Sequence, residues 1–296
     1  MLGGSGFVGT QLCAALVRNG WIVTVPTRNP DRAKHLKLLP TLALVAADVH
    51  DVEKLSVLCS GQQAVVNLIG ILNERGRDGR GFEQAHTALA RKVVAACRRQ
   101  RVPRLLHMSA LNADADRGVS HYLRTKGRAE RIVREECGAD VGWTIFRPSV
   151  IFGARDAFVN RFSRLLRTIP LVFPLARPGA RFQPVWVEDV VAAYMQALAD
   201  DGTAGESYEL GGPEILTLRE IVAMARDRLG LRRLILGLPD FAARLQAALF
   251  DFVPGKPFST DNYRSLLQDS LVRSDGFARL GVRPQPLGAV FPNYAG

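Results

Sequence analysis

The residue pair best suited to chemistry in this 296-residue sequence is Tyr122 with Lys126, a tyrosine followed four positions later by a lysine. Positions i and i+4 of a helix lie on one face, so the two side chains would be neighbours. An ammonium beside a phenol stabilises the phenolate, which lowers the pKa of the phenol and suits it to general acid–base catalysis beside a nicotinamide. Lys126 would also reach the ribose of that nicotinamide. Such pairs also occur by chance in helices, but the position of this one, after the fifth strand of the predicted sheet, favours the functional interpretation.

A glycine repeat, G-x-x-G-x-x-G, places Gly3, Gly6 and Gly9 directly before a helical pattern. Gly3 permits a tight turn, Gly6 lets the backbone approach a pyrophosphate, and Gly9 lets helix and strand pack closely. The amides of the helix N-terminus then bind the phosphates. Ser5 and Phe7, inside the loop, complete the predicted contacts with the cofactor.

Only Met1 and Leu2 precede this loop, although a dinucleotide-binding fold has its central strand there. We therefore expect the first strand to be largely missing from the sequence. A truncated chain or a start codon assigned too late would explain this. The sheet would then keep at most a stub of its middle strand.

The next predicted strand ends at two arginines instead of a carboxylate. An acidic residue at this place would accept the ribose hydroxyls of NAD, whereas Arg28 and Arg32 offer guanidinium groups suited to a 2′-phosphate. The alternative is that both are ordinary surface arginines. This chemistry predicts NADP(H) as the preferred cofactor, with NAD(H) as the alternative.

Two further strand ends carry candidate cofactor contacts. Asp48, with Val49 beside it, follows the third strand, where a carboxylate can accept from the adenine amine. Leu68 and Gly70 end the fourth strand, where the backbone would pass under the nicotinamide-side ribose. Ligands bind at the carboxyl ends of parallel strands, so these strand ends predict a dinucleotide site more specifically than the glycine loop alone.

Short apolar runs alternate with amphipathic stretches through the first half of the chain, which predicts βαβ units and a doubly wound parallel sheet. The predicted strands cover residues 21–27, 42–46, 64–69, 104–108 and 142–146, and the predicted helices cover 9–19, 30–38, 52–59, 82–101 and 121–137. Prolines interrupt this rhythm after residue 148. We predict an α/β Rossmann domain over residues 1–150 and a small C-terminal α+β lobe over residues 151–296, interleaved with the first domain, for a substrate or partner.

The formal charge of +11 suits contact with phosphates, nucleic acid or an anionic membrane. The arginines are spread over many elements, so we predict no specific nucleic-acid binding. The four cysteines and five histidines lack ligand spacing, which predicts buried free thiols and no metal site. Without a signal peptide or an apolar run of about 18 residues, the chain is predicted to be cytoplasmic, with a peripheral place on the inner membrane as the alternative.

The chain resembles the short-chain dehydrogenase/reductase superfamily, in its extended and atypical branch. The motifs that carry the resemblance occur in the expected order: GGSGFVG, TRNPDR, AADV, NLIG, YLRTK and FRPSVIFG. More narrowly, YLRTKGRAE, RPSVIFGARDAFVNRF and QPVWVEDVVAAYMQAL are similar to bacterial relatives of the Rossmann-type accessory subunit of respiratory complex I. That resemblance implies a bound NADPH and a role in stabilising a partner or in quinone-linked chemistry.

The resemblance also implies three further site residues. Active members of the branch carry a hydroxyl residue after the fifth strand that holds the substrate oxygen with the tyrosine, and Ser109 occupies that place here. Ser109 either hydrogen-bonds a substrate or caps the strand end, and we weigh these alternatives equally. Arg147 and Pro148 open the turn that, in relatives, lines the nicotinamide side.

An apolar stripe lies late in the chain, at Phe241, Leu245, Ala248, Leu249 and Phe252. Packing in the core is the default prediction for such a stripe. The alternative is that region 231–258 docks to a protein partner or a membrane surface.

Two hypotheses for function remain open on the sequence. The first is an accessory-type protein with a chiefly structural NADP(H) and weak reductase activity on an apolar or quinone-like carbonyl. The second is an active nucleotide-sugar epimerase, dehydratase or reductase, with Tyr122 as acid/base, Lys126 as its pKa modulator and Ser109 as hydrogen-bond donor. The second needs cationic residues for a diphosphate, which these arginines could supply: Arg155, Arg161, Arg177 and Arg181.

Overall fold

A parallel sheet forms the centre of the computed structural model, which describes residues 1–290. Its strands are β1 (Val23–Thr27), β2 (Leu42–Ala46), β3 (Ala64–Asn67), β4 (Arg104–Met108), β5 (Gly142–Pro148) and β10 (Glu206–Leu210). β1 pairs with β2, and β3, β4, β5 and β10 pair in that order, with every pair parallel. Because both faces are covered at the centre of this sheet, β3 is a nearly continuous apolar run, whereas polar and apolar residues alternate in β10 at the edge.

Met1 and Leu2 join the two parts of the sheet. The Leu2 amide donates to the Val66 carbonyl at 2.8 Å, and the Leu2 carbonyl accepts from the Leu68 amide at 3.0 Å. On the other side, the terminal ammonium donates to the Thr24 carbonyl at 2.9 Å. The spatial order is therefore β2, β1, the stub, β3, β4, β5 and β10. This order confirms the predicted doubly wound fold, with the first strand reduced to a two-residue stub.

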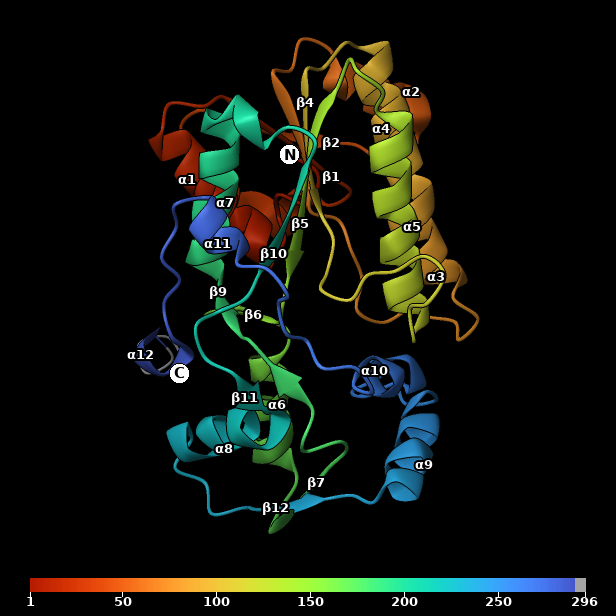
Figure 1. The fold of residues 1–296 in the computed structure, drawn as a ribbon, viewed down its shortest axis with the longest axis vertical. Helices are drawn as coiled ribbons and strands as arrows, with labels where there is room; N and C mark the ends of the chain where they lie inside the picture. Colours follow the sequence, from red (N-terminus) through yellow and green to blue (C-terminus); the bar gives the residue numbers. More distant parts are fainter. Residues whose placement is uncertain (291–296) are drawn as a thin grey trace.

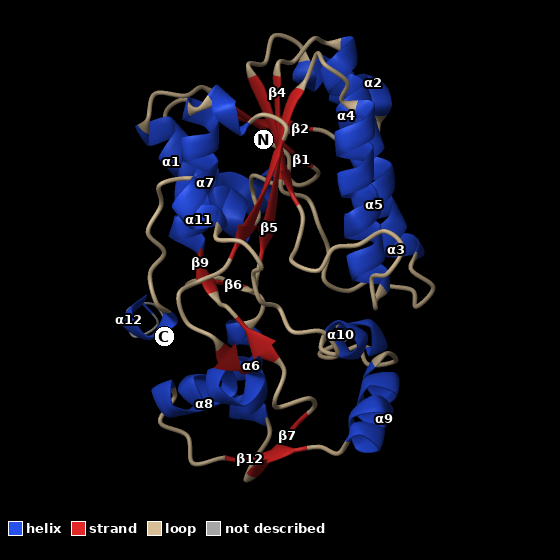
Figure 2. Cartoon of the chain, in the orientation of Figure 1, coloured by secondary structure: helices blue, strands red, loops and turns tan. Residues whose placement is uncertain are grey.

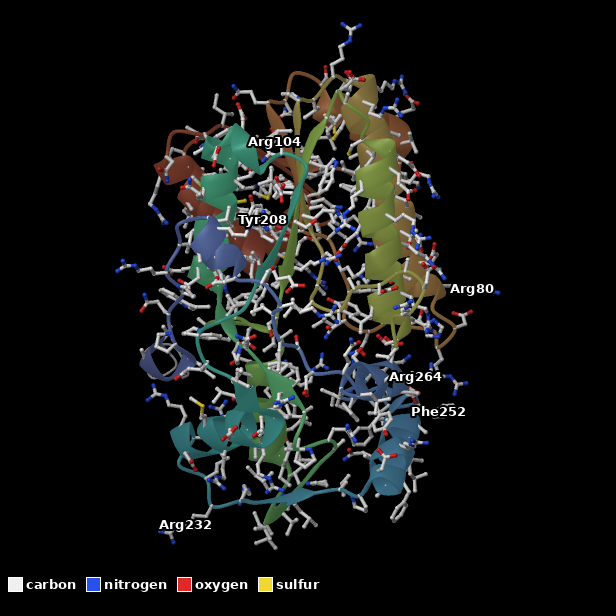
Figure 3. All side chains as sticks on the ribbon, viewed as in Figure 1. Arg80, Arg104, Tyr208, Arg232, Phe252 and Arg264 are labelled. Carbon is white, nitrogen blue, oxygen red and sulfur yellow. The ribbon has the colours of Figure 1, made fainter. Side chains whose placement is uncertain are left out.

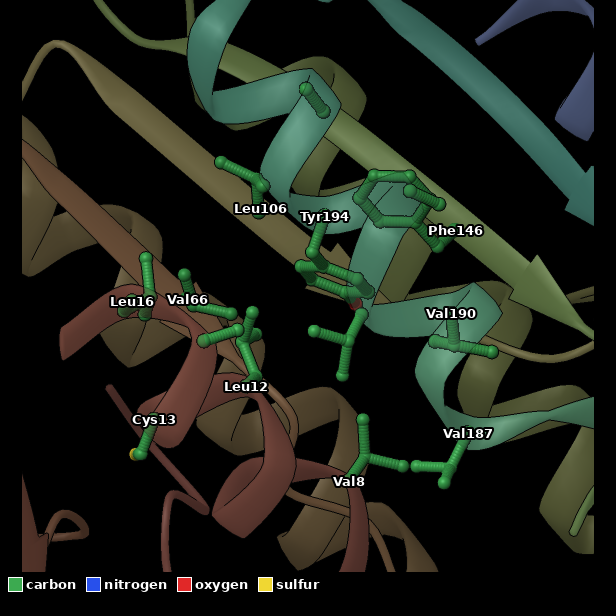
Figure 4. Close-up of a cluster of buried hydrophobic side chains, with 14 of the residues drawn as sticks. Val8, Leu12, Cys13, Leu16, Val66, Leu106, Phe146, Val187, Val190 and Tyr194 are labelled. Atoms are coloured by element: carbon green, nitrogen blue, oxygen red, sulfur yellow. The ribbon is translucent and has the colours of Figure 1, made fainter. Parts of the chain in front are cut away.

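Two layers of helices enclose the sheet (Figure 1). One layer contains α1 (Phe7–Arg18), α7 (Val187–Ala199) and α11 (Gly276–Arg279), and the other contains α2 (Val52–Cys59), α4 (Leu89–Arg99) and α5 (His121–Glu136). Figure 4 shows Leu12 of α1 and Tyr194 of α7 meeting Phe146 of β5 in the core of the first layer. Thus β10, α7 and α11, which come from the second half of the chain, complete the first domain.

Local signals explain where the helices begin. Asp51 caps α2, and Ser120 caps α5 by accepting from the Leu123 amide. Two predicted helices differ in kind: residues Pro30–Leu38 form a 3-10 helix, and a π-helical turn, Glu83–Ala88, separates α3 (Arg80–Phe82) from α4. The four cysteines are buried and free, as predicted.

The remaining elements form a smaller lobe below the carboxyl ends of the strands (Figure 2). They are β6 (Ile151–Phe152), α6 (Val159–Thr168), β7 (Val172–Leu175), β8 (Arg181–Phe182), β9 (Val185–Trp186), η3 (Asp201–Thr203), β11 (Leu216–Thr217), α8 (Leu218–Arg228), β12 (Leu234–Gly237), α9 (Asp240–Phe250), α10 (Thr260–Ser265) and α12 (Leu287–Val290). Of these, η3 lies against the main sheet, beside β5. The predicted lobe also includes residues 291–296, which lie outside the described residues. Across residues 1–290, no helix combines the length and apolarity needed to cross a bilayer.

Candidate functional site: a dinucleotide cradle beside Tyr122 and Lys126

The glycine loop leads from the stub into α1 and leaves room for a phosphate. Gly3 has a φ of +78°, a conformation that costs other residues energy. A Cβ on Gly9 would lie 2.2 Å from the Gly3 carbonyl oxygen, so only glycine lets the helix approach this closely. No side chain caps α1, and its first turn contains no acidic residue. Amides at the end of such a helix attract an anion, so the loop fits a pyrophosphate.

The segments that follow β1 and β2 present polar groups to solvent. Arg28 and Arg32 are both exposed, and within residues 1–290 their guanidinium groups form no ion pair. Asp48 is exposed and accepts from the His50 amide at 3.0 Å through one carboxylate oxygen. Val49 beside it is half-buried. These residues stand where sequence reasoning placed the adenosine end of the cofactor.

Lys126 lies between the ends of β3 and β4. Its Nζ donates to the Met108 carbonyl at 3.0 Å, and a Cβ built on Gly70 would lie 3.0 Å from the same Nζ. Burial lowers the pKa of Lys126 to about 8, against the opposing influence of Glu130. The structure therefore brings Lys126 to the backbone of residues 68–70, the predicted place of the nicotinamide ribose.

Tyr122 lies one helical turn before Lys126, in an aromatic environment. Its ring packs edge-on against Phe82 and His86, with centroids 6.1 Å and 5.5 Å away. Burial raises the pKa of Tyr122 to about 12. The predicted lowering of this pKa by Lys126 is therefore wrong for the protein alone, because burial disfavours the charged phenolate. A phenol that keeps its proton at neutral pH is suited to donate one.

Ser109 follows β4 and is 2% exposed. Its amide donates to the Phe146 carbonyl at 2.7 Å, but its Oγ has no hydrogen-bond partner among residues 1–290. A buried hydroxyl without a partner costs roughly 1–3 kcal/mol, so such a group usually meets a ligand or an ordered water. Of the two alternatives for Ser109, the unpartnered hydroxyl favours hydrogen bonding to a ligand.

The predicted cofactor contact through Arg147 is not supported by its side chain. Its Nε donates to Glu130 at 2.8 Å and its Nη2 bonds the second oxygen of that carboxylate. Glu130 belongs to α5 and is 1% exposed. The guanidinium thus ties α5 to β5, because a buried carboxylate needs a charged partner. The carbonyl of Pro148 accepts from the Leu111 amide at 3.0 Å, so it too has a structural partner.

Two positioning residues escaped sequence reasoning. His86, in the π-helical turn, accepts from the Ile71 amide at Nε2 (3.1 Å), and its Nδ1 lies 2.9 Å from Thr125 Oγ1. Asp261 of α10 accepts from the amides of His121 and Tyr122 at 2.7 Å and 3.1 Å. Asp261 therefore caps α5, the helix that carries the tyrosine. His86 lies in a π-helical turn, a conformation that is frequent at functional sites. Neither contact has a sequence signal, because each joins distant parts of the chain.

A glycine cradle at a helix N-terminus, polar groups at the carboxyl ends of parallel strands and a tyrosine–lysine pair one helical turn apart define a Rossmann-type dinucleotide-binding protein. The model of the NAD(P)H-binding family matches residues 3–156, and the chain belongs to that family. Within it, the chain is one of the extended and atypical short-chain dehydrogenase/reductases, among the relatives of the complex I accessory subunit.

Two curated relatives and one solved structure place the chain more closely. The mitochondrial NADH dehydrogenase (ubiquinone) 1 alpha subcomplex subunit 9 of Arabidopsis thaliana is 31% identical over 97% of this chain and 74% of that protein. The 4-hydroxy-2-methyl-3-oxo-4-farnesyl-3,4-dihydroquinoline-1-oxide ketoreductase of Stigmatella aurantiaca is 26% identical over 83% of this chain and 78% of that protein. A dTDP-glucose 4,6-dehydratase of Streptomyces venezuelae, solved with NAD, has a TM-score of 0.76 at 20% identity, over 99% of this chain and 94% of that one.

Proposed function

We propose that this protein binds NADP(H) chiefly as a structural cofactor and retains slow reductase activity on an apolar, quinone-like carbonyl. The observation that carries the proposal is Tyr122, protonated and in contact with the rings of Phe82 and His86, one turn before Lys126. An aromatic environment favours an apolar carbonyl over a hydrated sugar. The Stigmatella relative supports this reading, because its name describes a ketoreductase of a farnesyl-bearing ring ketone. The Arabidopsis relative, a complex I subunit by name, supports the structural role.

The reduction would follow from the chain's own groups. The reduced dinucleotide supplies the hydride when bound. Tyr122 Oη donates its proton to the carbonyl oxygen, and Ser109 Oγ donates a hydrogen bond to the same oxygen. Lys126, beside Gly70, holds the ribose through its ammonium. Burial of these groups keeps water from the reacting carbonyl.

The nucleotide-sugar alternative receives less support from the lobe. Of the arginines available for a diphosphate, Arg161 donates to the Pro257 carbonyl at 3.3 Å, and Arg177 is 3.8 Å from Asp240. Arg181 forms a paired contact with Asp269, with its Nη2 at 2.7 Å. A diphosphate would have to compete with these carboxylates and carbonyls for three of the four arginines. Arg155 is exposed and has no ion pair among residues 1–290, so it is the one arginine of the four that a diphosphate could bind without such competition. The likeness to the dehydratase is a likeness of fold.

The proposal is tested on the purified full chain. We expect NADPH to bind and, at about 100 times its Kd, to add about 2.7 kcal/mol to the free energy of unfolding, which corresponds to a rise in Tm of several degrees. NADPH oxidation is then followed with prenylated ring ketones, benzoquinones and nucleotide sugars, and only the first two should be reduced. Rapid turnover of a nucleotide sugar would replace this proposal with the alternative. Absence of NADPH binding would contradict both the proposed function and the nucleotide-sugar alternative.

The cofactor preference depends on two exposed arginines. In an Arg28→Ala/Arg32→Ala variant, we expect the Kd for NADPH to rise about 10- to 100-fold, because charge-assisted hydrogen bonds to the 2′-phosphate are lost, while the Kd for NADH stays the same. Fluorescence titration with both nucleotides measures this. Lys37→Ala, an exposed cation on the same 3-10 helix, is the matched control. An equal loss of affinity for NADPH and NADH would contradict the assignment of these arginines to the 2′-phosphate.

A further inference from the structure

A group of large apolar side chains is exposed at one end of the smaller lobe. They come from the turn before β7, from β12 and from α9, and several are more than half exposed, as Phe241 and Leu171 at 75% illustrate. We call this surface the apolar end, and it comprises Leu171, Val172, Leu234, Leu236, Phe241, Leu245, Leu249, Phe252 and Val253. A group of large exposed apolar side chains of this kind is typical of a site of interaction with a protein or a membrane.

Helix α9 is packed with its large side chains outward. Its buried residues are Ala243 and Ala247, which contact a small cluster with Ala176 and Tyr263. Phe241, Leu245 and Leu249 repeat every four residues and lie on the opposite, exposed side. The default prediction that this stripe packs in the core is therefore wrong. The helix attaches to the lobe through alanines and leaves the apolar face uncovered.

The sheet beside α9 continues the same surface. β12 pairs in parallel with β7, which sets Leu234 beside Val172. Leu234 and Leu236 point outward, whereas Ile235 between them is buried. Leu171 has a φ of +56°, a conformation unfavourable for leucine, yet its side chain is directed to solvent. The carbonyl of Leu171 accepts from the Leu234 amide at 2.9 Å, so this turn joins β7 to β12 and presents the leucine side chain to solvent.

The surroundings of the apolar end are cationic. Residues 157–183 contain five arginines and no acidic residue, although Arg177 and Arg181 are paired with Asp240 and Asp269. Arg167 stands four residues before Leu171, Arg232 two residues before Leu234, and both are exposed. Figure 3 shows Arg232 projecting from the end that carries β12, and Phe252 at the opposite end of α9, on the side of the main domain. Arg77 adds a guanidinium 4.4 Å from the centre of the Phe252 ring.

Two carboxylates near the apolar end, Asp240 and Asp251, are at least partly exposed, but each has a hydrogen-bonding partner. Asp240 accepts from the Tyr263 hydroxyl and pairs with Arg244 at 2.9 Å. Asp251 accepts from the amide and hydroxyl of Thr260, at 3.1 Å and 2.6 Å. The charge offered to an approaching surface is therefore mainly that of the arginines.

We propose that the apolar end seats this protein on an anionic lipid bilayer. Phenylalanine and leucine side chains on an exposed helix enter the acyl boundary, while arginines around them bind the lipid phosphates. A second copy of the chain fits less well, because a two-fold contact would bring two cationic rims together. The proposal is independent of the dinucleotide chemistry, so its failure leaves the proposed function untouched.

The test is sedimentation of the full chain with vesicles of phosphatidylcholine, alone or mixed with phosphatidylglycerol. We expect binding to the mixed vesicles that weakens with added salt, and little binding to the neutral ones. Phe241→Ser/Leu245→Ser should reduce the partition coefficient by more than about tenfold. Arg167→Gln/Arg232→Gln should reduce it about fivefold for each arginine at low salt.

Matched controls separate this surface from general stickiness. Ile22→Ser/Leu38→Ser removes side chains that are 81% and 85% exposed on other elements, and Arg18→Gln/Arg98→Gln removes distant surface charges. Both controls should bind vesicles like the unchanged chain, and every variant should keep its Tm. Equal binding to neutral and anionic vesicles, or no binding to either, would overturn the proposal. So would a dimer that Phe241→Ser/Leu245→Ser dissociates while vesicle binding stays the same.

Discussion

Replacement of Gly9 by alanine is expected to abolish dinucleotide binding and to destabilise the fold. The new Cβ would lie 2.2 Å from the Gly3 carbonyl oxygen and 2.6 Å from Gly4 Cα, far inside van der Waals contact. Both neighbours are backbone atoms of the loop that shapes the phosphate site, so no side chain can rotate away. The loop must open or α1 must move, and close packing transmits that shift.

We expect Gly9→Ala to raise the Kd for NADPH more than about 100-fold and to cost about 1–3 kcal/mol of stability, as overpacking does. Fluorescence titration and thermal unfolding measure the two effects. Gly179→Ala is the control, since a Cβ there meets no atom within 4 Å. Gly6→Ala should fall between them, with its nearest contact at 3.2 Å. NADPH binding by Gly9→Ala at the original affinity would show that the cradle is not the phosphate site.

The second large effect is expected from Tyr122→Phe. Removing the hydroxyl removes the group that donates the proton in the proposed reaction. We expect turnover of the prenylated ketone to fall about 10²- to 10⁴-fold, the usual contribution of a positioned acid. The ring contacts with Phe82 and His86 remain, so the Tm and the Kd for NADPH should change little.

Tyr194→Phe provides the matched control for this variant. Tyr194 is fully buried between α7 and β5, and its hydroxyl also lacks a hydrogen-bond partner among residues 1–290. It contacts no part of the proposed reaction site, so its loss should leave turnover unchanged. If Tyr122→Phe keeps full turnover, the proton comes from another group and the assignment of Tyr122 fails. A parallel loss in both variants would indicate a structural cause.

Much of the fold was predictable because strands and helices carry local patterns. The strands predicted at 42–46 and 104–108 have the bounds observed for β2 and β4, and the helix predicted at 52–59 has those of α2. The element predicted at 30–38 also has the observed bounds, and the other core elements differ by one or two residues at their ends, where capping and pairing decide the boundary. The π-helical turn was missed, since its sequence has the same helical periodicity as its neighbours.

The candidate site was predictable to the extent that short motifs fix backbone shape. Gly3 and Gly9 are required by the turn and by the close approach of α1, and the Tyr122–Lys126 spacing follows from the helix. The surroundings of the side chains at this site were not predictable. Burial raises the pKa of Tyr122, and the guanidinium of Arg147 forms an ion pair with Glu130. Both effects depend on neighbours from other elements, which the sequence does not reveal.

The sequence by itself determined the alternation of strands and helices, the glycine cradle and the helical pairing of tyrosine with lysine. These are short-range properties, set by residue spacing and by the conformations each residue allows. Only the tertiary structure decided that Asp261 caps α5, that Ser109 Oγ lacks a partner and that α9 turns its phenylalanine outward. An amphipathic stripe indicates that one face of a helix is apolar. Which face is covered depends on packing against residues far away in the chain.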